Sequence, residues 1–320
     1  MDSSDVLTLL MIEGVGRRTI LKLKNKLKNE DIDALDLNDL IEEMATIKKQ
    51  SIKLGNASFQ EAQRQTEMIL EECFLKNITI ISCFQRSFPN RLLEMGLDCP
   101  AVIFVKGDLS VLDGNLNIGI VGTRKPTDSG FLKGKQYSKK IVERRGNVVS
   151  GLALGCDRAG HLGALEGNGK TLAVIPNGIG HVYPNVHRPL YDKILESGGC
   201  ILSEYAPNEP PQSYFFIERN RLQAALSDGL LIIESTIKGG TAWTYQYGLN
   251  YGKSIAVSQH EPYAGKYGTL NEQILVEDKG IPIKHESDLV KWVEALNRRR
   301  HETYNQSTHR TTSFDQYHQR

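Results

Sequence analysis

The feature that most constrains this fold is a series of short apolar runs, each followed by glycine, hydroxyl or basic residues. The runs fall between residues 78 and 259, and helix-length segments separate most of them. An apolar run without polar alternation is typical of a strand buried on both faces of a sheet. A glycine-rich loop after such a strand exposes backbone N–H groups that can hold a phosphate. The pattern therefore predicts a parallel α/β sheet with an anion-binding edge.

The expected strands and helices alternate along the chain. We expect strands at 78–81, 101–105, 118–121, 147–150, 171–175, 200–202, 230–233, 254–257 and 281–283. Helices are expected at 128–145, 156–166, 189–196, 217–226 and 241–251, with two more around the last strand within 265–297. This alternation predicts right-handed βαβ units in an extended Rossmann-like, mostly parallel sheet with helices on both faces.

Two further segments flank this sheet. Residues 1–75 carry apolar side chains at helical spacing, which predicts a small helical N-terminal domain before the Rossmann-like domain at 76–297. Within the first segment, Gly14 and Gly16 separate two short helices. That pattern fits a phosphate-contacting helix-hairpin-helix, and it fits a plain glycine turn in a helical bundle as well. Residues 298–320 are polar and nearly free of aliphatic side chains, so we expect a disordered tail.

Composition narrows the class of protein. With 40% hydrophobic and 24% charged residues and a net charge of +1, the chain is typical of a soluble globular protein, and any anion site depends on local clustering of charge. No apolar run is long enough to span a membrane, and the N-terminus lacks the basic start of a secretory signal, so a cytoplasmic location is expected. The five cysteines include no CxxC pair, so we expect neither a metal site nor a redox pair.

The candidate phosphate-binding residues follow the expected strands. They are Gly122, Thr123, Arg124, Ser150, Gly151, Gly239, Gly240 and Thr241. Glycines allow close backbone approach, hydroxyls donate hydrogen bonds, and an arginine can pair with phosphate through two bonds. If the loops converge, they form one crevice at the carboxyl edge of the sheet; each loop alone is equally consistent with a structural βα turn. None contains a Walker lysine or a dinucleotide fingerprint.

A second group of candidates lies in the segment FFIERNRLQAALS. Its Arg219, Asn220 and Arg221 suit phosphate contact, and the aromatic residues 214–216 just before them could stack unpaired bases. Core aromatic residues beside a helical salt-bridge face explain the same pattern equally well. Lys170 opens a strand and would lie at the far edge of the sheet, unless the glycine-rich approach to it folds over.

Read together, the blocks resemble the DNA-processing protein A (DprA/Smf) family over roughly residues 85–276. The matching blocks include FPNRLL, VGTRKPTDSG, SGLALGCDRAGHLGALEGNGKTLAVIPNG, LSEYAP, ERNRLQAALSDGLLIIE and GGTAWTYQYGLNYGKSIAV. The resemblance implies a non-enzymatic, cofactor-free homodimer that binds single-stranded DNA and hands it to a RecA-type recombinase during natural transformation. It assigns Arg124 and Lys170 to the family's pocket, and residues 219–221 to the family's RNR tripeptide.

The chain also departs from that family. Leu154 replaces a usual arginine, Ser258 and Gln259 replace a usual Pro-Gly, Gly239 and Gly240 replace a usual Ser-Gly, the block GTLNEQIL is poorly kept, and no C-terminal winged helix is recognisable. A DNA or nucleotide sensor in phage defence therefore remains an alternative.

A phosphoribohydrolase-like enzyme on the same fold is a further alternative. Those enzymes carry PGGxGTxxE, whereas this chain has KGGTAWTYQY, without the proline and the catalytic glutamate. The nearby carboxylate is Glu234, which we expect to cap or orient the loop that follows it. The lone His161 has no second histidine at ligand spacing, so a structural role is expected for it.

Overall fold

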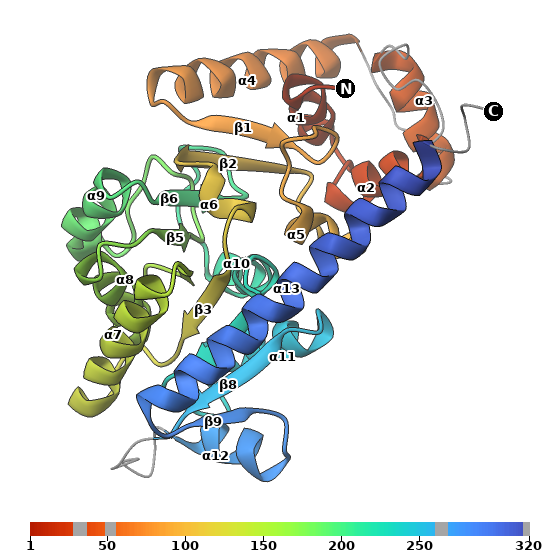
Figure 1. The fold of residues 1–320 in the computed structure, drawn as a ribbon. Coiled ribbons are helices and arrows are strands. Elements are labelled where there is room, and N and C mark those ends of the chain that lie inside the picture. The colour runs from red at the N-terminus through yellow and green to blue at the C-terminus, as the bar shows by residue number, and fades with distance from the viewer. Residues whose placement is uncertain (28–36, 49–55, 260–267, 316–320) are drawn as a thin grey trace.

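The computed structural model describes residues 1–27, 37–48, 56–259 and 268–315. Its centre is a nine-stranded sheet in the order β1-β2-β6-β5-β4-β3-β7-β8-β9 (Figure 1). The strands are β1 (Thr79–Ser82), β2 (Val102–Gly107), β3 (Asn117–Val121), β4 (Asn147–Ser150), β5 (Thr171–Val174), β6 (Cys200–Ser203), β7 (Gly229–Ile232), β8 (Ser254–Ser258) and β9 (Ile281–Ile283). Every predicted strand is present, because continuous apolar runs mark strands that are buried on both faces.

The sheet is mostly parallel, as predicted. Strands β1 and β2 pair antiparallel with each other and β2 pairs antiparallel with β6, whereas all other neighbours are parallel. From β3 the chain adds β4, β5 and β6 on one side, and then crosses to add β7, β8 and β9 on the other. The order of strands therefore reverses between β3 and β7, where Val121 lies opposite Ile232. A crevice is expected at the carboxyl ends of such a pair.

Helices cover both faces of the sheet. The α-helices between β2 and β9 are α6 (Ser110–Asp113), α7 (Asp128–Glu143), α8 (Cys156–Glu166), α9 (Arg188–Glu196), α10 (Ser213–Ala225), α11 (Gly240–Asn250) and α12 (Thr269–Val276). Helices α7, α8 and α9 lie together along one side in Figure 1. Ile120 of β3 shares a buried cluster with Tyr137 of α7, whereas Val121 shares one with Tyr245 of α11. Successive strand residues thus point to opposite helical layers.

The N-terminal segment forms helices that pack at the β1 end of the sheet (Figure 1). They are α1 (Ser3–Met11), α2 (Arg17–Lys26), α3 (Leu37–Lys48) and α4 (Asn56–Leu75), and a short α5 (Asn90–Leu93) follows β1. The Ser3 hydroxyl donates to the carbonyl of Ile80 at 3.1 Å, and Arg17 pairs with Glu218 of α10 at 2.5 Å. The buried side chains of α1 and α2 belong to the same apolar cluster as those of β2. The domain boundary at residue 75 stays a prediction.

The expectation of a disordered tail from residue 298 is wrong as far as the structure describes the tail. Helix α13 runs without interruption over Glu286–Asp315 and crosses the front of the molecule in Figure 1. Its first turns bury Trp292 and Leu296, and Arg300 donates to the carbonyl of Asp113. The costly step in forming a helix is its first turn, which packing provides here. Each further residue adds one backbone hydrogen bond, so polar residues can continue the helix. Residues 316–320 of the expected tail lie outside the described residues.

Three general expectations concern membranes, cysteines and metals. Among the described helices, none is both long and apolar enough to cross a bilayer. All five cysteines are buried, with free thiols. Within the described ranges, no three His, Cys, Asp or Glu side chains gather where they could hold a metal ion. A cytoplasmic location and the absence of a metal or other cofactor stay predictions.

Candidate nucleic-acid interface

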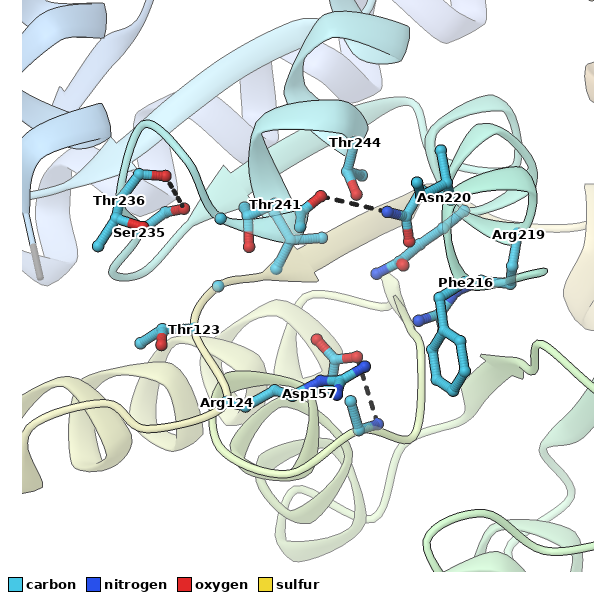
Figure 2. A pocket seen from close by; sticks show the side chains of 17 residues that line it. Thr123, Arg124, Asp157, Phe216, Arg219, Asn220, Ser235, Thr236, Thr241 and Thr244 are labelled. Atoms are coloured by element: carbon cyan, nitrogen blue, oxygen red, sulfur yellow. Dashed lines mark hydrogen bonds between the residues drawn. The ribbon is translucent and has the colours of Figure 1, made fainter. Parts of the chain in front are cut away.

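A cavity of about 390 Å³ opens at the carboxyl ends of β3 and β7, and we call it the switch-point crevice. Figure 2 shows its lining, which comes from the loops after β3, β4 and β7, from the start of α8 and from helices α10 and α11. Its volume lies within the range of pockets that hold small ligands. The structure therefore brings the β3 and β7 loops together, as the sequence predicts for one anion-binding crevice.

The loop after β3 is held by contacts with Cys156 and Glu234, and its Arg124 lines the crevice. A Cβ atom on Gly122 would lie 2.4 Å from Cys156 Sγ and 2.9 Å from the carbonyl oxygen of Glu234. Glycine is therefore needed here for packing against α8. The N–H of Thr123 donates to the Glu234 carbonyl at 2.7 Å. The Arg124 guanidinium lies 5.1 Å from the ring centre of Phe216, within cation–π distance.

The loop after β7 delivers a helix N-terminus to the same crevice. Helix α11 begins at Gly240, and its N-cap residue Gly239 offers no side chain to cap the first turn. A Cβ built on Gly240 would meet nothing within 4 Å, so its backbone faces open space. Thr241 and Thr244 add hydroxyl groups beside it (Figure 2). Uncapped N–H groups and the helix dipole both favour an anion at this point.

Helix α10 forms the third wall and contributes buried donors. Arg219 is 5% exposed and donates from Nη1 to the carbonyl of Val174 at 2.6 Å, while Gln223 is 2% exposed. Among the described residues, neither Arg219 Nε nor Gln223 Nε2 has a hydrogen-bond partner. Asn220 donates to the carbonyl of Gly240 at 3.2 Å and so links α10 to α11. A buried donor without a partner costs free energy, which a ligand acceptor in the crevice would recover.

Asp157 orients the loop after β4 beneath the crevice. Its carboxylate accepts hydrogen bonds from the N–H groups of Gly151 at 3.1 Å and Ala153 at 3.3 Å. Burial raises the pKa of Asp157, and the nearby Arg219 charge opposes that rise. A Cβ on Gly151 would lie 1.8 Å from Arg219 Nη1, so glycine makes room for the arginine. Asp157 therefore holds this loop in place.

Four candidates lie outside the crevice: Gly151, which lines a smaller neighbouring hollow, and Ser150, Lys170 and Arg221. Ser150 is fully buried and donates to the carbonyl of Ile120 at 2.7 Å, so its hydroxyl is used within the sheet. Lys170 stands at the amino edge of β5, opposite the crevice, and pairs with Asp108 at 2.5 Å. The glycines before it do not fold over, and the two pocket residues implied by the resemblance, Arg124 and Lys170, are not in one cavity.

Arg221 is likewise not a phosphate ligand of the crevice. It is 1% exposed and lies between Glu204 and Glu218, with which it forms ion pairs. The three residues of the RNR tripeptide therefore lie in two places. Arg219 and Asn220 line the crevice, whereas Arg221 belongs to an internal ion-pair network. The alternative of a helical salt-bridge face is correct for Arg221 alone.

Glu234 holds the loop after β3, and not the loop after β7 that follows it in the sequence and that we expected it to orient. It is 0% exposed, and its carboxylate accepts hydrogen bonds from the Thr127 N–H at 2.8 Å and hydroxyl at 2.6 Å. It does not line the crevice. The only carboxylate that does, among the described residues, is Asp157, which is already engaged by two backbone N–H groups.

Several lining residues were missing from the sequence-based candidates. They are Asp157, Ile217, Gln223, Ser235, Thr236 and Thr244. Helical spacing gives a signal for two of them, because Gln223 lies one turn after Arg219 and Thr244 lies about one turn after Thr241. Ser235 and Thr236 follow the apolar run of β7 in the same way that Thr123 follows β3.

Comparison with known proteins identifies the family. The family model for DNA recombination-mediator protein A matches residues 61–293. DNA processing protein DprA of Bacillus subtilis is 36% identical over 59% of this chain and 64% of its own length, so the chain spans less than two thirds of that relative. Protein Smf of Borreliella burgdorferi is 31% identical over 74% of this chain and 73% of its own.

Solved structures agree with the match. DNA processing protein A of Streptococcus pneumoniae superposes with a TM-score of 0.75 and 27% identity, over 91% of this chain and 98% of that one. Its Helicobacter pylori counterpart, described for a unique single-stranded DNA binding mode, has a TM-score of 0.60 and 24% identity, over 69% and 96% of the two chains, and shows the shared fold. The chain belongs to the DNA recombination-mediator protein A family.

Proposed function

We propose that this protein binds single-stranded DNA, without sequence preference, through the switch-point crevice. On this proposal it acts as a recombination mediator that protects single strands and delivers them to a RecA-type recombinase in natural transformation or DNA uptake. Family membership and the curated DprA relatives support this role. The homodimer stays a prediction that goes with it.

The observation that carries the proposal is the set of donors around one open crevice. The uncapped N-terminus of α11 and the side chains of Arg124 and Arg219 all line this cavity, and Arg219 Nε has no hydrogen-bond partner among the described residues. The anionic oxygens of a phosphodiester accept hydrogen bonds from donors of this kind, and Arg124 can engage one phosphate with two parallel bonds. Phosphate contact of this kind carries no base identity, so sequence-independent binding follows.

An aromatic side of the crevice favours an unpaired strand. Phe216 borders both the crevice and a smaller hollow of about 40 Å³ that Leu154 also lines. Tyr183 packs edge-on against Phe216, with ring centres 5.5 Å apart. Accessible rings beside an arginine stack unpaired bases, whereas the bases of a duplex are already stacked on each other. We therefore expect single strands to bind more tightly than duplex.

The absence of catalysis is part of the proposal. Glu234 is sequestered by Thr127, and Asp157 is both buried and bonded to backbone N–H groups. Neither is placed as a general acid or base toward the crevice, which argues against the glycosidic cleavage of phosphoribohydrolases. Purified protein should release no free base, no phosphate and no shortened DNA. Such release, lost in Glu234→Gln, would favour the enzyme instead.

The decisive experiment compares two single-charge variants at opposite edges of the sheet. Arg124→Ala should weaken binding of a labelled oligothymidylate by about 1–3 kcal/mol, because it removes a charge-assisted contact. Lys170→Ala removes the same charge at the amino edge and should leave the dissociation constant unchanged. Fluorescence anisotropy at several salt concentrations measures both, and a smaller salt slope is expected for Arg124→Ala alone.

Clear outcomes would contradict this assignment. Equal affinity of the wild type for blunt duplex and single strand would contradict the stacking argument. Normal binding by a folded Arg124→Ala variant would exclude the crevice. If the protein bound a free nucleotide but no oligonucleotide, the result would favour the sensor alternative.

A further inference from the structure

A second cavity of about 820 Å³ lies between the N-terminal helices and α10, and we call it the α2–α10 cleft. Leu10 and Met11 of α1 and the start of α2 line one side. Tyr205 and Tyr214 are on the other. The function proposed above does not use this cleft.

The aromatic residues 214–216 are consecutive in the sequence and line the two cavities between them. Phe215 stacks on Tyr205 with ring centres 3.7 Å apart, and Tyr214 packs edge-on against Phe215 at 4.5 Å. Tyr214 is 58% exposed, so its ring is available to a ligand. The next residue, Phe216, borders the crevice. The first turn of α10 thus separates the two cavities and presents aromatic side chains to both.

The cleft also offers donors, and its carboxylates are paired. Arg17 Nη1 holds Glu218 at 2.5 Å, and Glu204 is bonded to Arg221. Arg17 Nε is buried and has no hydrogen-bond partner among the described residues. Helix α2 begins after Gly16, which provides no side-chain cap, and it opens with two arginines. This helix start is attractive to an anion.

We infer that a bound single strand continues from the switch-point crevice, over the first turn of α10, into the α2–α10 cleft, where a base stacks on Tyr214. The inference rests on the proposed function. It follows from the position of the two cavities on either side of residues 214–218, from the rings on both sides of that turn, and from the arginine-rich start of α2. Rings and uncapped N–H groups match the bases and phosphates of a nucleic acid strand.

The length of the oligonucleotide separates this path from the crevice itself. An oligothymidylate of about 4 nucleotides fills one small site, whereas one of about 12 can reach both cavities. Tyr214→Ala should weaken binding of the longer strand about fivefold or more, as expected for the loss of one stacked base, and leave the shorter strand unaffected. Tyr214→Phe keeps the ring and should restore the affinity. Phe74→Ala, at an 82% exposed ring on α4, is the matched control.

Crosslinking tests the path directly. With 5-iodouracil placed at successive positions of the longer strand, irradiation and mass spectrometry should find attachment at Tyr214 or Tyr205, several nucleotides away from the position that attaches to Phe216. Attachment only at the crevice would overturn the inference, as would unchanged affinity of Tyr214→Ala for the longer strand. If Tyr214→Ala also weakened binding of the shorter strand, Tyr214 would belong to the crevice, and the inference would again be overturned.

Failure of the proposed function has a different signature. In that case Arg124→Ala would bind both strands as well as the wild type does, or the wild type would bind neither. Either result removes the crevice, and with it the path that starts there.

Discussion

His161 has the chemistry of a catalyst or metal ligand, but the fold uses it internally. The side chain is fully buried, and the Leu152 N–H donates to its Nε2 at 3.3 Å. The proton is therefore on Nδ1, which lies 2.7 Å from the Thr171 hydroxyl. That hydroxyl donates onward to the carbonyl of Val148 at 2.8 Å. The ring joins α8 to β4 and β5, and the structural role expected for it is confirmed.

This burial makes the stability of the protein depend on pH. Burial lowers the pKa of His161 from 6.5 to about 3, so the folded protein keeps the ring neutral where the unfolded chain takes up a proton. The contribution of His161 to stability is therefore complete above pH 6.5 and is lost as the pH falls from 6.5 toward 3, by at most about 1.4 kcal/mol per pH unit. Urea unfolding at pH 7 and pH 5 measures the loss.

The control compares slopes with pH, because the variant also loses hydrogen bonds at every pH. His161→Gln should be less stable than the wild type at pH 7 but should lose less on acidification. His181→Gln, at an exposed histidine, should keep the wild-type slope. Equal slopes in wild type and His161→Gln would show that His161 does not cause the pH dependence.

At the scale of elements, α10 does three things at once. Arg219 and Gln223 face the crevice, Leu222 packs in the core, and Arg221 lies in the ion-pair network beside α2. Residues two apart on a helix are about 200° apart around its axis, so the two arginines of the RNR tripeptide point in nearly opposite directions. The helical period alone could have separated them. The sequence alone does not show which of the two arginines lies beside Glu204, because Glu204 comes from a segment outside α10.

The ion-pair network gives a prediction about stability. Arg221→Ala leaves Glu204 without its partner in a largely buried site, so unfolding should become easier by about 3 kcal/mol or more. Thermal or urea unfolding measures this, and the affinity of the folded fraction for a strand of about 4 nucleotides, which fills the crevice alone, should not change. Arg18→Ala, at a side chain 69% exposed, should change stability by less than about 0.5 kcal/mol. Restored stability in the double variant with Glu204→Ala would confirm the pair; additive losses would contradict it.

The strands and the loops after them could be predicted because apolar runs and glycines are local signals. The β3 and β7 loops meet because the chain order reverses there, which follows from the parallel topology. The hydrogen bond that uses Ser150 and the packing that requires Gly122 depend on neighbours distant in sequence. For Lys170 the two arguments disagreed: its position at a strand start placed it correctly at the amino edge, whereas the family resemblance did not.

At the scale of the whole molecule, the long helix α13 ties distant segments together. Trp292 donates to the Ser254 hydroxyl of β8 at 2.9 Å, and Arg300 donates to the carbonyl of Asp113 at the end of α6. Arg300 Nη1 also lies 3.8 Å from the Asp228 carboxylate, which Arg91 binds at 2.7 Å. The C-terminal helix is thus anchored where β3 and β7 begin, at the edge of the sheet opposite the crevice.

Truncation after Asn297 tests this anchor. Removal of residues 298–320 deletes the Arg300 contacts but leaves the buried Trp292 and Leu296, so the fold should persist with a melting temperature lowered by about 2–4 °C for each kcal/mol lost. The single change Arg300→Ala should reproduce most of that shift, since a hydrogen bond from a charged group contributes about 1.5–3 kcal/mol. Arg298→Ala, at an exposed neighbour, should not. Differential scanning calorimetry of the three variants decides the matter: an unchanged melting temperature in the truncated protein would mean that α13 beyond residue 297 adds nothing to the stability of the sheet.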